Sequence, residues 1–117
     1  MATQYIGSGT FVANSAITAF RNVVISNNRG VGLAATAGSV DGVSLVDAAS
    51  GDYVTVAFLT ANGTLKGTLV NGPVTVGDTL YVGATGLVSG NGTVACGKTL
   101  TTATTDGSIV EFIPKGL

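Results

Sequence analysis

The chain is predicted to be an all-β protein, a compact β-barrel or sandwich of short antiparallel strands. Its apolar residues occur in short runs rich in Val, Ile, Thr, Leu, Phe and Tyr, and glycine-containing turns separate these runs. No stretch keeps a helical period outside one turn near residues 34–37. A length of 117 residues is that of one domain with one core, because two smaller pieces would each bury too little surface.

Short segments rich in β-forming residues predict the individual strands. They cover residues 23–26, 42–45, 53–59, 64–70, 79–82, 87–89 and 108–113, and Pro114 is expected to end the last one because proline cannot donate to a strand ladder. Asn-Gly pairs at residues 62–63, 71–72 and 91–92 predict two-residue hairpin turns. The first pair, in "VAFLTANGTLKGTLV", predicts the clearest hairpin of the chain.

The chain resembles itself in two places. "RNVVISNNRGV", which begins at Arg21, aligns without a gap to "GDTLYVGATGL", which begins at Gly77, and this puts Val24 on Leu80. "GVSLVDAASGDYVTVA" aligns to "GKTLTTATTDGSIVEFI" after a one-residue adjustment. We expect a single β domain over residues 17–117 with pseudo-repeats at about 17–58 and 73–113. The alternative, that any two glycine-rich β-meanders align this well, remains open.

The alignment predicts which residues face the core and which make the turns. Residues two apart on a strand share a face, so the expected core residues are Val54, Val56, Val110 and Phe112. The expected turn residues are Gly30, Gly51, Asp52, Gly77, Asp78, Gly86 and Gly107. Aspartate accepts hydrogen bonds from nearby backbone amides, and the alignment places Asn22 opposite Asp78 and Ser108 opposite Asp52, which can do the same.

Residues 1–16 have no counterpart in the second repeat and are expected to form an N-terminal arm. Four of their apolar side chains are costly to leave in water, so we expect the arm to dock on its own domain or on a neighbour. The candidate contact residues are Tyr5, Ile6, Phe11 and Val12.

The composition indicates a protein that associates. Apolar residues make up 45% and charged residues only 9%, with a formal net charge of -1, whereas an average domain is about a quarter charged. Such a surface lacks the repulsion that keeps monomers apart. The five Lys and Arg residues form no basic stripe, so no direct nucleic-acid binding is expected. No apolar run approaches a membrane span and no signal segment is visible.

The side chains that catalysis needs are scarce, so no enzyme activity, catalytic residue or cofactor is expected. The chain has no histidine and one cysteine, which removes the usual zinc ligand sets and the Ser/His and Cys/His nucleophile systems. The acidic residues mostly lie beside glycines, where turn formation explains them. A surface calcium site built from turn aspartates stays open as an alternative. Cys96 is expected to be a buried structural thiol.

Taken in order, the motifs resemble the small capsid decoration, or cement, proteins of tailed bacteriophages. The segments are "FRNVVISNNRGVGLA", "GVSLVDAASGDYVTVAFL", "VTVGDTLYVGATGLVS" and "ACGKTLTTATTDGSIVEFIP". That family repeats a "v-x-x-G-D-x-v-y" strand, a "t-G-x-v-t" return and a closing "G-x-a-l-x-x-A-x-x-G-x-x-v-x-V" segment, and versions of each lie within residues 19–113. The N-terminal segment and "TLTTATTDG" depart from the family pattern.

The resemblance implies a compact β domain, made in the bacterial host cytoplasm, that sits on the outer capsid surface of the mature virion. It implies binding to the major capsid protein as homotrimers at three-fold and quasi-three-fold positions, which reinforces the shell without catalysis. The alternative is a glycan- or receptor-binding β module of a virion surface or tail-fibre protein. Such modules usually present exposed aromatic rings, and this chain has no Trp.

Overall fold

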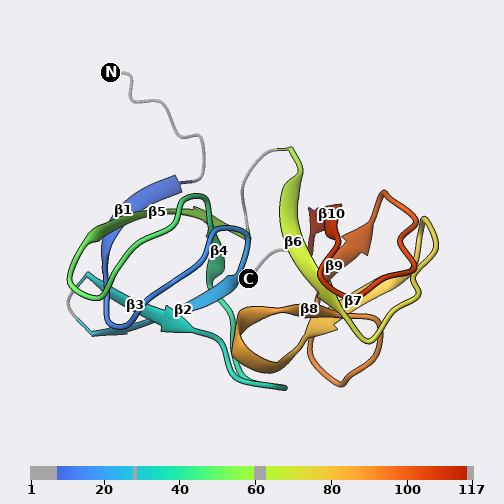
Figure 1. The fold of residues 1–117 in the computed structure, drawn as a ribbon, viewed down its shortest axis with the longest axis horizontal. Coiled ribbons are helices and arrows are strands. Elements are labelled where there is room, and N and C mark those ends of the chain that lie inside the picture. Colours follow the sequence, from blue (N-terminus) through green and yellow to red (C-terminus); the bar gives the residue numbers. More distant parts are fainter. Residues whose placement is uncertain (1–7, 28, 60–62, 116–117) are drawn as a thin grey trace.

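Two small β-barrels lie side by side along the longest dimension of the molecule (Figure 1). The structure is a computed structural model and describes residues 8–27, 29–59 and 63–115. The described residues form ten strands and one short 3-10 helix, and each sheet of five strands closes on itself. The prediction of an all-β fold is therefore confirmed, and the β units are two barrels. Closure leaves no free sheet edge inside either barrel.

The first barrel has the strand order β1-β3-β2-β4-β5, with β5 closing onto β1. Strand β1 is parallel to β3, and the other neighbours are antiparallel. Its strands are β1 (Ser8–Ala13), β2 (Asn22–Asn27), β3 (Gly30–Leu33), β4 (Gly42–Ser44) and β5 (Tyr53–Phe58).

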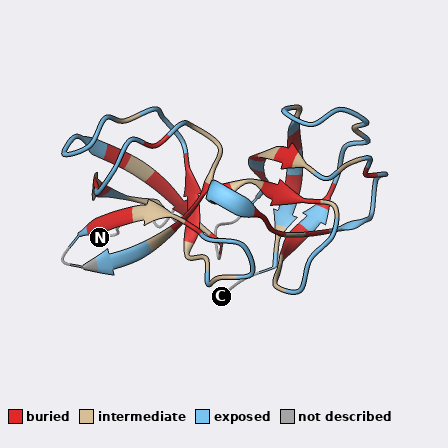
Figure 2. Ribbon diagram, turned by 60° about the horizontal axis from the view of Figure 1, so that its bottom comes forward, coloured by how far each residue is buried: buried red, intermediate tan, exposed pale blue. Residues whose placement is uncertain are grey.

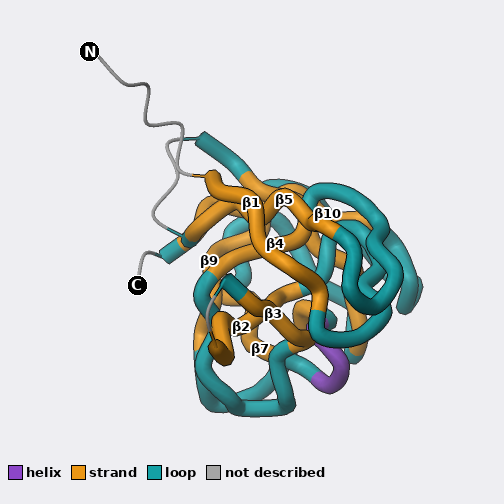
Figure 3. The backbone as a smooth tube through the Cα atoms, turned by 90° about the vertical axis from the view of Figure 1, so that its left-hand side faces the viewer, coloured by secondary structure: helices purple, strands orange, loops and turns teal. Residues whose placement is uncertain are grey.

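The second barrel repeats this topology with β6-β8-β7-β9-β10, and β10 closes onto β6. Strand β6 is parallel to β8, as β1 is to β3. Its elements are β6 (Leu65–Val70), β7 (Thr79–Val82), η1 (Ala84–Gly86), β8 (Val88–Ser89), β9 (Ala95–Thr99) and β10 (Ile109–Pro114). In Figure 3 the helical turn η1 is the purple segment.

Residues 8–13 form β1 of the first barrel, although the sequence predicted an arm over residues 1–16. Strand β1 pairs with β5 from Ser8 to Val12 and with β3 at Val12 and Ala13. Strand β6 takes the same place in the second barrel, so β1 has a counterpart after all. The arm prediction is therefore wrong for residues 8–13, because their pairing partners lie far away in the sequence. Tyr5 and Ile6 lie outside the described residues.

The Asn-Gly pairs do not make the predicted hairpins. Strand β5 belongs to the first barrel and β6 to the second, so the segment around residues 62–63 connects two barrels. Strand β6 pairs with β8 and β10, and β9 pairs with β7 and β10, so neither of the other two Asn-Gly pairs joins hydrogen-bonded neighbours. A favourable turn sequence permits a reversal of the chain, but it does not decide which strands pair.

The two barrels correspond residue by residue in a register that differs from the sequence alignment. Val23 pairs with Gly42 across β2 and β4, and Leu80 pairs with Gly97 across β7 and β9. Leu80 therefore corresponds to Val23, and its expected match with Val24 is wrong by one residue. Such a shift turns every side chain to the other face. Val23 and Leu80 are both fully buried, whereas Val24 is half-buried.

Each barrel core contains a phenylalanine ring, and the two rings come from different strands. The pairing of β1 with β5 and of β6 with β10 places Gly67 at the position of Phe11, and Phe112 at the position of Val56. Phe11 and Phe112 are both buried. A Cβ atom on Gly67 would lie 2.7 Å from Val88 Cγ1 and 3.3 Å from the Phe112 ring. Gly67 therefore leaves the space that Val88 and the Phe112 ring fill.

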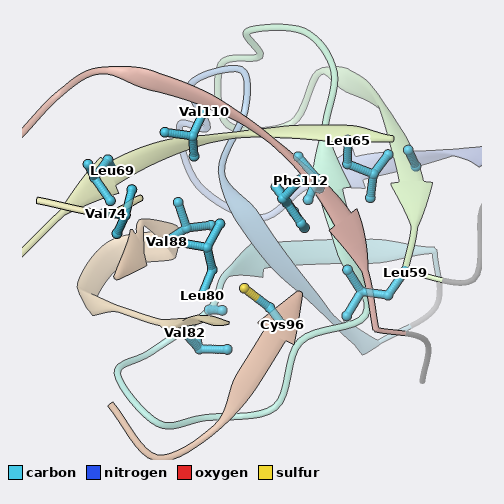
Figure 4. Close-up of a cluster of buried hydrophobic side chains, with 13 residues drawn as sticks. Leu59, Leu65, Leu69, Val74, Leu80, Val82, Val88, Cys96, Val110 and Phe112 are labelled. Atoms are coloured by element: carbon cyan, nitrogen blue, oxygen red, sulfur yellow. The ribbon is translucent and has the colours of Figure 1, made fainter. Parts of the chain in front are cut away.

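The barrels pack against each other through a shared apolar cluster (Figure 4). The first barrel contributes Ala34, Val43, Ala57 and Leu59, and the second contributes most of its own core, including Leu65, Cys96 and Phe112. Hydrogen bonds between described residues of the two barrels also cross this interface.

Backbone and side-chain hydrogen bonds join the two barrels at β6, β7 and η1. The Thr68 N–H donates to Phe20 O at 3.1 Å, and the Ala37 N–H donates to Val82 O at 3.2 Å. The Gly86 N–H donates to Ala34 O at 2.9 Å, and Arg21 Nη1 donates to Thr85 O at 3.2 Å. The interface is thus both apolar and hydrogen-bonded.

Candidate interaction surfaces

Most acidic side chains near the turns bind backbone amides. Asp78 Oδ2 accepts from the Thr75 N–H at 2.9 Å. Asp41 Oδ2, Asp47 Oδ1 and Asp106 Oδ1 accept from the amides of Ile25, Ala19 and Gly72. Asp52 closes its turn through the backbone, where its N–H donates to Ala49 O at 3.0 Å. The carboxylates of Asp41, Asp47, Asp78 and Asp106 therefore have a structural role, since each accepts a hydrogen bond from a backbone N–H.

The turn glycines differ in what the backbone requires of them. Gly51 and Gly107 have φ of 89° and 91°, and they occupy equivalent turns before β5 and β10. Gly77 and Gly86 also lie in the left-handed region, which favours glycine. Gly30 instead lies in β3 and pairs with Val12.

Asp78 corresponds in the first barrel to Arg21. The Thr99 N–H donates to Asp78 O and the Ser44 N–H donates to Arg21 O, both at 2.9 Å, in equivalent turns. The expected counterpart, Asn22, corresponds to Thr79 because both begin a strand at the same register. A carboxylate at one position and a guanidinium at the other cannot share a catalytic role.

Among the described residues, no group of three or more His, Cys, Asp or Glu side chains could hold a metal ion. Cys96 is buried at the barrel interface, where Asn22 Nδ2 lies 3.9 Å from its Sγ atom. Burial raises the pKa of the Cys96 thiol to about 11. Across the part of the chain that is described, no helix is long and apolar enough to cross a membrane.

The predicted core residues lie inside the barrels, whereas the described contact candidates, Phe11 and Val12, differ in burial. Val54, Val56, Val110 and Phe112 are all at most 1% exposed. Phe11 is also buried, at 6%, and packs in the core of the first barrel. Figure 2 shows this division, with buried segments inside each barrel and exposed loops around it. Of the described contact candidates, Val12 remains at the surface and is half-buried.

Large apolar side chains are exposed outside both barrels. They are Ile25, Leu45, Val46, Tyr53, Val76, Leu100, Ile109 and Ile113. Leu45 and Leu100 occupy equivalent positions in the two barrels. The Leu45 N–H donates to Thr55 O at 2.9 Å, and the Leu100 N–H donates in the same way to Glu111 O at 2.8 Å. Leu45 thus lies beside the strand that carries Tyr53. Its counterpart Leu100 lies beside the strand that carries Ile109.

A largely apolar groove of about 340 Å³ lies on β9 and β10 of the second barrel. It is lined by Thr79, Ala95, Gly97, Lys98, Ile113, Pro114 and Lys115. A second groove of about 400 Å³ is more polar and lies where the loop after β3 meets the second barrel. Its side chains include Thr36, Asn71, Ser89, Asn91 and Thr93. Sequence reasoning missed both grooves, because each is lined by several separate segments that only strand pairing and barrel packing bring together.

Comparison with solved structures finds a chain of the same architecture. The fold resembles the base of a phage head fiber. The crystal structure of the head fiber gp8.5 N base in bacteriophage phi29 superposes with a TM-score of 0.76, covering 92% of this chain and 92% of that chain at 22% sequence identity. No protein-family model and no curated protein sequence matches this chain. The likeness therefore concerns the fold of nearly the whole chain.

Proposed function

We propose that this chain is a structural protein on the outer surface of a bacteriophage head. The observation that carries the proposal is the shared two-barrel fold with the phi29 head fiber N base, which extends over 92% of both chains. The order of β motifs supports it independently, because it resembles the capsid decoration proteins. The two lines of support concern different features, since one is a fold and the other is a sequence pattern.

The surface of the protein suits attachment by burial of area. Only 9% of the residues are charged, and apolar side chains such as Tyr53, at 76% exposure, and Ile109, at 48%, face outward. A specific interface typically buries about 1,600 Å². Several copies that each bind two or more shell subunits gain further from multivalency. The partner is the major capsid protein, and the copies associate with each other as trimers.

The proposed mechanism is passive reinforcement. A protein that binds only the assembled, expanded shell lowers the free energy of that state by its binding free energy. Disruption of the shell must then also break these contacts. The mechanism requires no cofactor and no catalytic group, and it places the protein on the virion after synthesis in the bacterial cytoplasm.

Electron microscopy of phage particles made with and without the chain tests the proposal. We expect density for the two barrels at three-fold and quasi-three-fold positions on the outside of the head. On heating, heads that lack the chain should release DNA at a lower temperature than decorated heads. When the salt concentration is lowered step by step, they should also release DNA earlier, while the salt concentration is still higher. Equal resistance of the two kinds of head would contradict reinforcement, and density elsewhere on the virion would contradict the location.

A variant pair adds residue-level detail to this test. Tyr53→Ser removes the most exposed of the large apolar side chains without disturbing a core contact, so the free energy of unfolding should stay within about 0.5 kcal/mol of wild type. Binding to bare heads should weaken if this face meets the shell. Thr104→Ser, at an exposed loop position, is the control that should bind as wild type does.

Glycan binding is the second candidate function, and the polar groove favours it. Hydroxyl and amide side chains converge there, with Asn71 Nδ2 donating to Ser89 Oγ at 3.1 Å. A glycan array probed with the isolated protein tests this role. Binding that disappears in Asn91→Leu would support it, and an array without any signal would reject it.

A further inference from the structure

The groove on the second barrel has an equivalent on the first barrel that is already covered. Comparison of the strand registers matches Thr79 with Asn22, Lys98 with Val43, Ile113 with Ala57 and Lys115 with Leu59. All four first-barrel residues are at most 5% exposed. Val43, Ala57 and Leu59 belong to the cluster that packs against the second barrel. One face of the same fold is therefore an interface in one barrel and an open groove in the other.

We propose that the open groove binds a second copy of this chain, head to tail, through the first barrel of that copy. The second barrel covers the first within one chain, so the first barrel of the next copy can cover the second by a similar contact. Each copy then presents one groove and one covering surface. Such a heterologous contact closes into a ring or continues as a filament. Only the expectation that the ring contains three copies rests on the proposed function.

The covering surface inside one chain consists of β6, η1 and the end of β7. Lys66 Nζ lies 5.8 Å from the centre of the Phe20 ring, and Arg21 Nη1 donates to Thr85 O. The equivalent surface of the first barrel consists of β1, the end of β2 and Arg29, because the registers match Ile25 with Val82 and Val31 with Val88. Among the described residues of that surface is Ile25, which is 41% exposed.

Charge complementarity supports the match at its closest point. Arg29 follows Ile25 by four residues, as Gly86 follows Val82, so Arg29 is the counterpart of Gly86, and both have positive φ, at 56° and 79°. Within the chain, a Cβ atom on Gly86 would lie 3.1 Å from Arg21 Cβ. Because Asp78 corresponds to Arg21, the same contact between copies brings Arg29 of one copy to Asp78 of the next. Both residues are exposed. Within the chain the Arg29 guanidinium lies 4.7 Å from the centre of the Phe11 ring and donates to Thr10 O, so the contact between copies adds Asp78 to these partners.

The contact between copies must be wider than the contact within the chain. A Cβ atom on Gly86 would lie 2.6 Å from Asn22 O, so an arginine at the equivalent position needs more space. The groove offers that space, and Ile113 at 47% exposure with Lys98 and Lys115 beside it replaces the tightly packed Val43, Ala57 and Leu59. The lysine stems can cover apolar surface while their charges stay in water.

Light scattering on the isolated full chain at increasing concentration tests the inference. Ile113→Glu should shift the protein toward the monomer, with a dissociation constant raised about tenfold or more, because it places a charge in the apolar groove. Ile109→Glu is the matched control: it lies on the same face of β10 with 48% exposure against 47% but outside the groove. A monomer at every concentration, or equal effects of the two variants, would overturn the inference.

Charge reversal tests the pairing of the two named residues. Arg29→Glu and Asp78→Arg should each weaken association, since each brings like charges together, and the double variant should recover most of the loss. Circular dichroism and the thermal midpoint of each variant show that it is folded. No recovery in a folded double variant would overturn the contact. Binding of the wild-type protein to bare heads is measured separately, so a wrong interface and a wrong function give different results.

Discussion

Gly97 and Phe112 lie so close across β9 and β10 that a Cβ atom on Gly97 would be 2.5 Å from the Phe112 ring. The first barrel repeats this relationship, because a Cβ atom on Gly42 would be 2.7 Å from Val56 Cγ1. Backbone atoms are equally close, with Ile113 O 2.4 Å from the same point at Gly97. The glycine is thus required by packing in both barrels.

Gly97→Ala is expected to destabilise the protein by about 1–3 kcal/mol, because an added methyl group must displace a backbone carbonyl and a buried ring. Gly32→Ala is the matched control: Gly32 lies in β3, and no atom lies within 4 Å of its Cβ position. Chemical denaturation measures both variants. Equal free energies of unfolding for the two would contradict the packing argument.

Neighbouring residues of β5 should respond in opposite ways to an acidic side chain. Val56 is fully buried, so Val56→Asp places an unpaired charge in the first core and should cost roughly 3–5 kcal/mol or prevent folding. Thr55 faces outward, and its counterpart in the second barrel is Glu111, so Thr55→Glu should leave the thermal midpoint nearly unchanged. Similar midpoints for the two variants would refute the assignment of faces.

The thiol of Cys96 should make the protein less stable at alkaline pH. Burial raises its pKa from 9.0 to about 11 in the folded state. Below pH 9 both states keep the proton. Between about pH 9 and pH 11 the unfolded state loses it first, so the free energy of unfolding falls as the pH rises.

Denaturation curves of wild type and Cys96→Ala across this pH range isolate the effect, since the two proteins differ only at this side chain. The difference in stability between the two should shrink as the pH passes 9. A thiol reagent should also react with Cys96 only after unfolding. A pH-independent difference, or rapid reaction of the folded protein, would contradict the buried thiol.

The amino-acid sequence by itself determined the fold class, most strand positions and the low-charge surface. Periodicity is local, so it predicts that Val54 and Val56 share a face and that β-forming runs become strands. The turn at Asp78 is also local, because its carboxylate accepts from the Thr75 N–H three residues earlier in the chain. Each of these features depends on residues that are neighbours in the chain.

Only the tertiary structure decided which strands pair, where one barrel ends and which face is covered. The segment around residues 62–63 has ideal hairpin chemistry and nevertheless connects two barrels, because β5 and β6 find better partners far along the chain. The one-residue difference between Val23 and Val24 as the match for Leu80 has the same origin, since register is set by pairing and burial. Packing against the second barrel likewise buries Val43, whereas its counterpart Lys98 is exposed. Pairing and burial are non-local, so no short stretch of sequence specifies them.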